Sequence, residues 1–369
     1  MLRTILTIAV LLLGAGAWTP ANADATALRA AATSFLADLS GAQREALSFP
    51  LKDNARATWS NLPIAMAPPA GVLLAELSDA QRHLVHKMLQ ASLSSQGYAK
   101  STAIMWLDDI LRISEKANLE NNPEARKNPV AVAMADNRSS GNYAIAMFGD
   151  PGSDGWGWKI TGHHLAVNIT VKGNQIGALP GYYGSNPRVV PDGPYAGFMA
   201  LGSESELGMD LMTSLDLQQQ ARASIASETP QDVLEGPGRR ASLKKFEGVP
   251  SKSLSPTQLG LLRRLVAEYV RNAKGAAAAD HIDAIAAGGW DNLWFSWRGS
   301  MDIDGQFYYR VHGARVLIEY NRQDPNHDHS VVRDPVNDYG EDWLGIHYTE
   351  THPSPAEYME NLRRAAGAD

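Results

Sequence analysis

Two closely spaced histidines are the residues of this sequence best suited to chemistry. His327 and His329 stand two positions apart in the run Asn-His-Asp-His, which follows a hydrophobic stretch. In an extended backbone, side chains two residues apart point to the same side, so both imidazoles are expected to face one point. Such a pair supplies two ligands for zinc, copper or iron. Because the motif is short, a polar surface loop rich in histidine and aspartate is the alternative interpretation.

The dipeptide His163-His164 opens a segment with the alternation of a strand. One face of that strand is apolar and points to the core, with Leu165, Val167, Ile169 and Val171. The other face is polar and aromatic, with His164, Ala166, Asn168, Thr170 and, by the same parity, Trp156 and Trp158. We expect this second face to form the floor of a ligand cleft, with His164 or His163 as the third metal ligand. An exposed polar face of a one-sided sheet is the alternative.

Four further residues are candidates for catalytic work beside the metal. Glu319 ends a hydrophobic strand and is expected to act as a carboxylate ligand or general base. Arg333 is suited to neutralising negative charge on a substrate, and Asn168 to orienting a ligand or a water. Asp334 follows Arg333 directly, so the two are either site residues or an ion pair that fixes the loop. His347 lies further along the chain, and the sequence gives it no role.

The other histidines fit structural positions better than a site. His83 and His86 are three apart on an expected helix, with no third ligand near them in sequence. His281 follows an aspartate at an expected helix start. His312 precedes a glycine in an expected hairpin turn, where its tolerance of unusual backbone angles suits it.

Helices and strands are expected in alternating blocks. Four capping boxes predict helix starts, because a capping side chain stands three residues before a glutamine in each of Ser40–Gln43, Ser78–Gln81, Asp216–Gln219 and Ser255–Gln258. Hairpin turns are expected at 173–174 and 312–313, and neither hairpin is stable alone. The sequence therefore predicts an α+β fold: a largely antiparallel central sheet from two hairpin regions, packed with N-terminal and mid-chain helices.

The expected organisation is one domain after an N-terminal export signal. Arg3, an apolar run over residues 5–18 and Ala21-Asn22-Ala23 have the order of a secretory peptide ending at residue 23, too short to span a bilayer. We expect a single α+β domain over 24–369, in the periplasm or secreted. Its blocks are 24–135 (mainly helical), 140–190 (strands), 203–290 (mainly helical), 293–335 (strands) and 336–369 (C-terminal loop and helix).

Composition excludes several classes of protein. The chain has 369 residues, of which 44% are hydrophobic and 20% charged, which fits a globular protein with a sizeable core. Lys and Arg number 33 against 40 Asp and Glu, so nucleic acid is not an expected partner. Stable insertion in a membrane is not expected either, because no segment after the signal approaches the length of a membrane span. The absence of cysteine excludes disulfides, thiolate metal sites and cysteine nucleophiles.

Several motifs in a fixed order resemble the bacterial family known as domain of unknown function 3500. They include Trp156-Gly-Trp158, Gly162-His163-His164-Leu165, Tyr183-Gly184-Ser185-Asn186-Pro187, Phe307-Tyr308-Tyr309-Arg310, Asn326-His327-Asp328-His329-Ser330, Arg333-Asp334-Pro335 and His347-Tyr348. The resemblance covers most of the chain after the signal. It implies that both histidine motifs are standing features of the family, but it implies no catalytic role for any residue.

We therefore expect an exported metalloprotein, and most simply a metal-dependent hydrolase with a small-molecule substrate. Three protein ligands leave a position at which a metal-bound water can lose a proton and attack an ester, amide or phosphoester. A second possibility is an exported binding protein that holds a sugar, a tetrapyrrole or copper without turnover. A third is hydrolysis without metal by a carboxylate pair such as Glu319 and Asp334.

Overall fold

The structure is a computed structural model that describes residues 21–344. Residues 1–20, which hold most of the expected export signal, lie outside the described residues. The same is true of residues 345–369, which include His347 and most of the expected C-terminal segment. No helix of the described chain combines the length and the apolar character needed to cross a bilayer.

The first half of the chain supplies helices α1–α6 and strands β1–β7. The helices are α1 (Ala21–Asp38), α2 (Gly41–Leu47), α3 (Asp79–Ser92), α4 (Ser95–Asn121), α5 (Pro123–Arg126) and α6 (Pro129–Asp136). The strands are β1 (Ser48–Phe49), β2 (Val72–Leu73), β3 (Tyr143–Phe148), β4 (Gly155–Gly162), β5 (Leu165–Lys172), β6 (Gln175–Gly177) and β7 (Gly181–Ser185).

The second half supplies helices α7–α11 and strands β8–β13. The helices are α7 (Gly202–Ser214), α8 (Leu217–Ala223), α9 (Pro256–Val270), α10 (Gly275–Gly288) and α11 (Glu341–Leu344). The strands are β8 (Ser224–Ala226), β9 (Val249–Pro250), β10 (Trp294–Gly299), β11 (Phe307–His312), β12 (Leu317–Asp324) and β13 (His327–Arg333).

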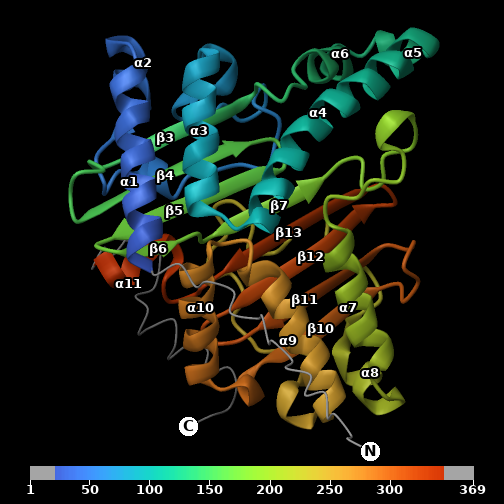
Figure 1. Cartoon of the computed structure of the whole chain (residues 1–369). Helices are drawn as coiled ribbons and strands as arrows, with labels where there is room; N and C mark the ends of the chain where they lie inside the picture. Colours follow the sequence, from blue (N-terminus) through green and yellow to red (C-terminus); the bar gives the residue numbers. More distant parts are fainter. Residues whose placement is uncertain (1–20, 345–369) are drawn as a thin grey trace, which may run out of the picture.

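All these strands join one sheet, which runs through the centre of the molecule (Figure 1). The order is β1-β3-β4-β5-β7-β13-β12-β11-β10-β8, with β2, β6 and β9 added to β3, β5 and β10. Neighbours are antiparallel except for β1 with β3 and β8 with β10. The expected α+β fold and its largely antiparallel sheet from two hairpin regions are confirmed.

The second half repeats the order of the first. In each half, two helices lead into a short edge strand, a second short strand and a helix pair follow, and antiparallel strands complete the unit. Thus β1 pairs in parallel with β3, as β8 does with β10, and β2 pairs antiparallel to β3, as β9 does to β10. The two halves are therefore two copies of one supersecondary unit.

A glycine marks the same corner in both copies. Gly71 has a φ of 114° and Gly248 a φ of 102°. A Cβ added to Gly71 would lie 2.1 Å from the carbonyl oxygen of Ile145, and one on Gly248 would lie 2.1 Å from that of Phe295. Only glycine fits either position, since both the backbone angle and the close approach exclude a side chain.

The copies are related by an approximate two-fold axis. Val167 of β5 pairs with Gly181, and the corresponding Ile318 of β12 pairs with Val332. Gly181 and Val332 are thus equivalent, and they also pair directly with each other where β7 meets β13. The axis passes through that pair.

The four predicted capping boxes are all present, and they form equivalent pairs across the two copies. In the first copy, Gln43 Nε2 donates to Gln81 Oε1 over 3.3 Å. In the second, Gln219 Nε2 donates to Gln258 Oε1 over 3.1 Å, and Gln258 Nε2 also donates to the carbonyl of Ser214. Each pair joins the N-termini of two helices, so one local motif also fixes how the helices pack.

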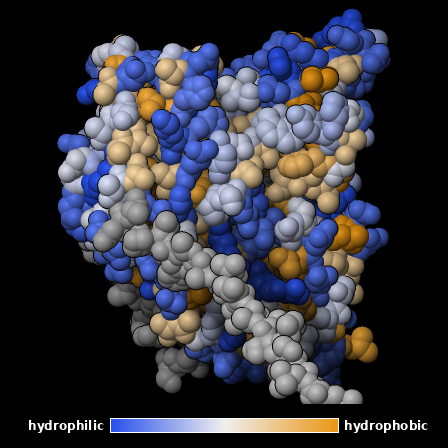
Figure 2. All heavy atoms as spheres, in the orientation of Figure 1, coloured by the Kyte–Doolittle hydropathy of each residue, from blue (hydrophilic) through white to orange (hydrophobic). Residues whose placement is uncertain are grey.

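The helices cover one face of the sheet and build the main core (Figure 1). Figure 2 shows hydrophilic side chains over much of the outer surface on this side. The expectation that Trp156 and Trp158 share a face with Asn168 is wrong. Trp158 pairs with Ile169, and both tryptophans pack in the main core. The two-residue turn at 163–164 places even-numbered residues of β4 opposite odd-numbered residues of β5, so parity reverses across it.

Loop segments bury the other face of the sheet. Arg56 donates to the Thr170 hydroxyl from the segment 53–62, and the backbone amides of Leu234 and Glu235 donate to Glu319 from the segment 230–247. The polar face expected on β5 exists, but its residues are 1–4% exposed. It is therefore an interior layer and does not form an open cleft floor.

Replacement of Gln258 by alanine tests the paired capping boxes. The variant Gln258→Ala removes the acceptor for Ser255 N–H and the links to Ser214 and Gln219. We expect the free energy of unfolding in urea to fall by about 1–3 kcal/mol. Gln218→Ala, at an exposed neighbouring position, is the control and is expected to change it by less than about 0.5 kcal/mol. Equal losses in both variants would contradict the role of the pair.

Candidate metal centre

Pairing of β7 with β13 brings the two histidine motifs together. His164 lies in the turn between β4 and β5, with a φ of 63°, and its carbonyl accepts the amide of Gly184 over 2.7 Å. Gly184 pairs in turn with His329 on β13. A Cβ on Gly184 would lie 3.0 Å from His164 Cδ2, so a larger residue there would displace the imidazole. Glycine in β7 thus allows the turn to approach β13.

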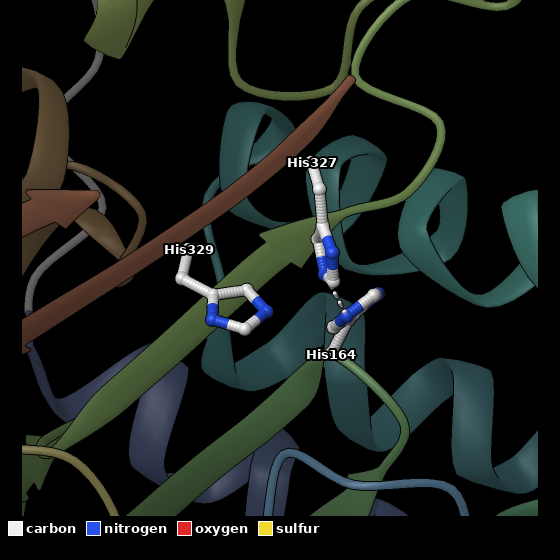
Figure 3. Close-up of side chains that lie close together, drawn as sticks. All are labelled: His164, His327 and His329. Carbon is white, nitrogen blue, oxygen red and sulfur yellow. Dashed lines mark hydrogen bonds between the residues drawn. The ribbon is translucent and has the colours of Figure 1, made fainter. Parts of the chain in front are cut away.

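Three imidazoles converge at this place, from His164, His327 and His329 (Figure 3). One potential ligand nitrogen from each lies within 4.8 Å of the others. The Nε2 atoms of His164 and His327 are 2.7 Å apart, while Nε2 of His329 is buried without a hydrogen-bond partner. Nitrogens that share one zinc at about 2.0–2.1 Å lie within roughly 4 Å of each other, so modest adjustment of the rings suffices for a common ion.

Burial keeps two of these rings in the neutral form that binds metal. Desolvation, with the nearby His163 and His327, holds the pKa of His164 well below its usual value. Desolvation and the proximity of His329 and His163 lower the pKa of His327 to about 3. At neutral pH both therefore present a lone pair without first having to lose a proton.

Asp232 orients His329. Its Oδ1 lies 2.8 Å from His329 Nδ1, which leaves Nε2 as the ring nitrogen that faces the cluster. Asn61 Nδ2 donates to the other carboxylate oxygen over 3.1 Å. Although burial opposes ionisation, the hydrogen bond and the electrostatic attraction of His329 hold the pKa of Asp232 below its usual value. A carboxylate behind a histidine is the common outer partner of a metal ligand.

Sequence reasoning missed Asp232. It lies in a polar segment with several Gly and Pro residues, far from either histidine motif in the chain, and a lone aspartate in such a segment carries no local signal. Its contact with His329 depends on how the segment 230–247 crosses the sheet. That path is set by long-range hydrogen bonds that periodicity and motif spacing do not report.

Of the two candidates for the third ligand, the geometry selects His164. The ring of His163 stacks on that of His164 at a centroid distance of 3.6 Å, but its Nδ1 lies 2.6 Å from Asp108 Oδ1. Arg138 also lies within 3.0 Å of its ring nitrogens. Residues of α4 and of the segment before β3 thus hold His163, whose ring packs against that of His164.

Glu319 is placed on the same face of the sheet but is fully engaged there. It is 0% exposed and accepts hydrogen bonds from two backbone amides of the segment 230–247 and from the hydroxyl of Tyr308. It does not belong to the group of converging metal-ligating atoms. Its visible role is to anchor the segment that carries Asp232.

The remaining predicted catalytic residues are also tied into the fold. Arg333 donates to the carbonyl of Glu235 and to Asp338, and Asp334 forms a bidentate pair with Arg315. Asn168 Nδ2 donates to the carbonyl of Pro180. Arg333 and Asp334 therefore pair with other residues, and the expected ion pair between the two does not form.

The other histidines do not join the cluster in the described residues. His83 is exposed on α3, and His86 Nδ1 lies 3.1 Å from the hydroxyl of Tyr98. His281 contacts a backbone carbonyl. His312, expected in a turn, instead ends β11 and is fully buried. The strand extends one residue further than predicted because its last pair, with Leu317, still fits the ladder.

Comparison with known proteins agrees with the motifs. A family model described as "Protein of unknown function (DUF3500)" matches residues 21–341. The chain belongs to this family. No curated protein and no solved structure matches it. For this DUF3500 member, the arrangement of its own residues is therefore the basis for any function.

Removal of the Asp232 carboxylate tests the outer partner of His329. In Asp232→Asn, the amide no longer holds the His329 ring by a charged hydrogen bond, and we expect zinc affinity to fall about 10–100-fold. Competition with a chromophoric chelator measures the affinity. Asp291→Asn, at an exposed position after α10, is the control. Unchanged affinity in Asp232→Asn would show that this carboxylate does not support a metal ligand.

Acid sensitivity of the metal-free protein tests the buried neutral state of His327. Its folded pKa of about 3 lies below the unfolded value near 6.5, so the unfolded state binds more protons between these values. The contribution of this histidine to the free energy of unfolding is therefore fully present above pH 6.5 and is lost as the pH falls. One such histidine contributes a slope of up to about 1.4 kcal/mol per pH unit. The free energy of unfolding in urea is measured from pH 7 to 4.5. Its slope against pH should be smaller in His327→Gln than in the wild type by up to that amount. Equal slopes in the two proteins would contradict a buried neutral His327.

Proposed function

We propose that this protein is an exported metal-binding protein of hydrolase type, with His164, His327 and His329 as metal ligands. The observation that carries the proposal is the buried Nε2 of His329, which has no partner yet faces two other imidazoles. An unpaired buried polar atom costs about 1–3 kcal/mol, and a metal ion at the common point removes that cost.

The donor set supports zinc, copper or iron. Three imidazoles are ligands that suit these ions, and no thiol is available in the sequence. Three protein ligands leave a coordination position for water, which a bound metal makes acidic enough to act as a nucleophile near neutral pH. The substrate class that follows is a small ester, amide or phosphoester.

Direct metal analysis tests the centre. We expect about one equivalent of zinc or copper per chain after reconstitution, and at least tenfold less in His164→Ala, His327→Ala and His329→Ala. His83→Ala removes an exposed imidazole and is the matched control. Metal content that stays undiminished in the cluster variants, or that is absent from the wild type, would refute the proposal.

A second candidate is an exported binding protein that holds copper or another metal without turnover. It is favoured by one observation: Glu319, Arg333, Asp334 and Asn168 are all held by other partners, which leaves them poorly placed for acid–base work. Hydrolysis of p-nitrophenyl acetate and p-nitrophenyl phosphate by the loaded protein separates the two. Turnover that chelation abolishes and metal restores supports the hydrolase, whereas metal binding without turnover supports the second candidate.

The export signal is part of the same proposal. Residues 1–23 have the order of a secretory peptide, so the mature chain is expected to begin at Asp24. N-terminal sequencing of the protein recovered from the periplasm or medium measures this start. Recovery of the uncut chain in the cytoplasm would contradict it.

A further inference from the structure

A cavity occupies the position that the two-fold axis relates to the histidine cluster. The turn between β4 and β5 carries His164, and the equivalent turn between β11 and β12 carries Arg315. Arg315 lines a cavity of about 240 Å³ that β6, β7, α9, α10 and α11 enclose. Figure 1 shows α10, β6 and α11 close together on this side of the sheet. The cavity does not include any member of the histidine cluster.

Two buried asparagines in the wall of this cavity each have one unpartnered side-chain atom. Asn272, which follows α9, is 2% exposed, and its Nδ2 has no hydrogen-bond partner. Asn337, which precedes α11, is 7% exposed, and its Oδ1 is likewise unpaired. Both residues line the cavity. Because buried polar groups are normally paired, these atoms leave an unused donor and an unused acceptor beside the cavity.

The charge around the cavity is negative. Its lining includes three carboxylates, on Asp280, Asp334 and Asp342, against the single guanidinium of Arg315. Arg315 is already neutralised by the bidentate contact with Asp334. Among the ion pairs of the described residues, none involves Asp280 or Asp342. Asp280 and Asp342 are themselves exposed to solvent, so they stand at the rim of the cavity. Partial desolvation and the nearby Asp283 raise the pKa of Asp280, so a cation beside it would be stabilising.

Aromatic rings and small apolar side chains form the rest of the wall. Trp343, Tyr183 and Tyr269 line the cavity, together with alanines from α10 such as Ala277. An aromatic face attracts an organic cation through its quadrupole, and this attraction is strongest where water is excluded. The volume is below the usual range for drug-sized ligands, so the occupant is small.

We propose that this cavity binds a small organic ammonium compound, with its cationic nitrogen near Asp280 and Asp342 and its apolar part against the aromatic rings. Asn272 and Asn337 then supply a donor and an acceptor to polar groups of the ligand. The site is separate from the histidine cluster and does not depend on metal.

Calorimetry with three probes of similar shape tests the charge that the cavity selects. Benzylamine carries the ammonium group, benzyl alcohol is neutral, and benzoate is an anion. We expect the purified protein to bind benzylamine at least tenfold more tightly than benzyl alcohol, and not to bind benzoate. Equal binding of benzylamine and benzyl alcohol, tighter binding of benzoate, or no binding of benzylamine would each overturn the proposal.

Variants assign any binding to this cavity. In Asp280→Asn/Asp342→Asn, benzylamine affinity should fall at least tenfold while that of benzyl alcohol stays the same. Asp291→Asn, at an exposed position outside the lining of the cavity, is the matched control. Ala277→Leu fills the cavity without a change of charge and should weaken the binding of both benzylamine and benzyl alcohol, which provides a second test if the double variant fails to fold.

His329→Ala should bind benzylamine as the wild type does, so the test of this cavity is independent of the test of the metal centre. Wild-type affinity in both cavity variants would place binding elsewhere and refute the site.

Discussion

The antiparallel pairing of β7 with β13 is the contact on which the rest of the structure depends. It joins two copies of one unit into a continuous sheet, and together with the pairing of β5 with β7 it sets how far the turn of one copy reaches along the last strand of the other. Because side chains alternate along a strand, a slip of one residue would send His327 and His329 to the helix-covered face. The convergence with His164 therefore requires this register of β7 and β13.

The cluster also depends on polar contacts beneath the loops. Glu319 accepts the backbone amides of Leu234 and Glu235, and this carboxylate thus holds the segment that presents Asp232 to His329. Burial of a carboxylate is costly unless its oxygens are paired, and here backbone amides and a tyrosine hydroxyl pair them. The polar face of the sheet is therefore an anchoring layer, which explains why residues that resemble catalytic groups in the sequence are occupied in the fold.

Local signals in the sequence predicted local structure well. The four capping boxes are complete because each needs only a cap and a glutamine three residues later, and the hairpin turn at 173–174 follows from its own residues. The same-side placement of His327 and His329 follows from strand periodicity. The predictions that failed concern contacts between residues far apart in the sequence. The parity of Trp158 reverses across a turn whose length the sequence does not state, and Asp232 reaches its histidine from a segment without regular pattern. The duplication was also hidden, because the copies share structural requirements, such as Gly71 and Gly248, rather than a run of identical residues.

The approximate two-fold axis has a consequence for how the chain can diversify. A homodimer assembled from one such unit would be bound by its symmetry to carry identical residues at both ends of the sheet. Fusion into a single polypeptide lifts that restriction, since each end is encoded separately. Here one end bears His164 and the other Arg315 in contact with Asp334, so the same scaffold presents two chemically unlike ends within one molecule.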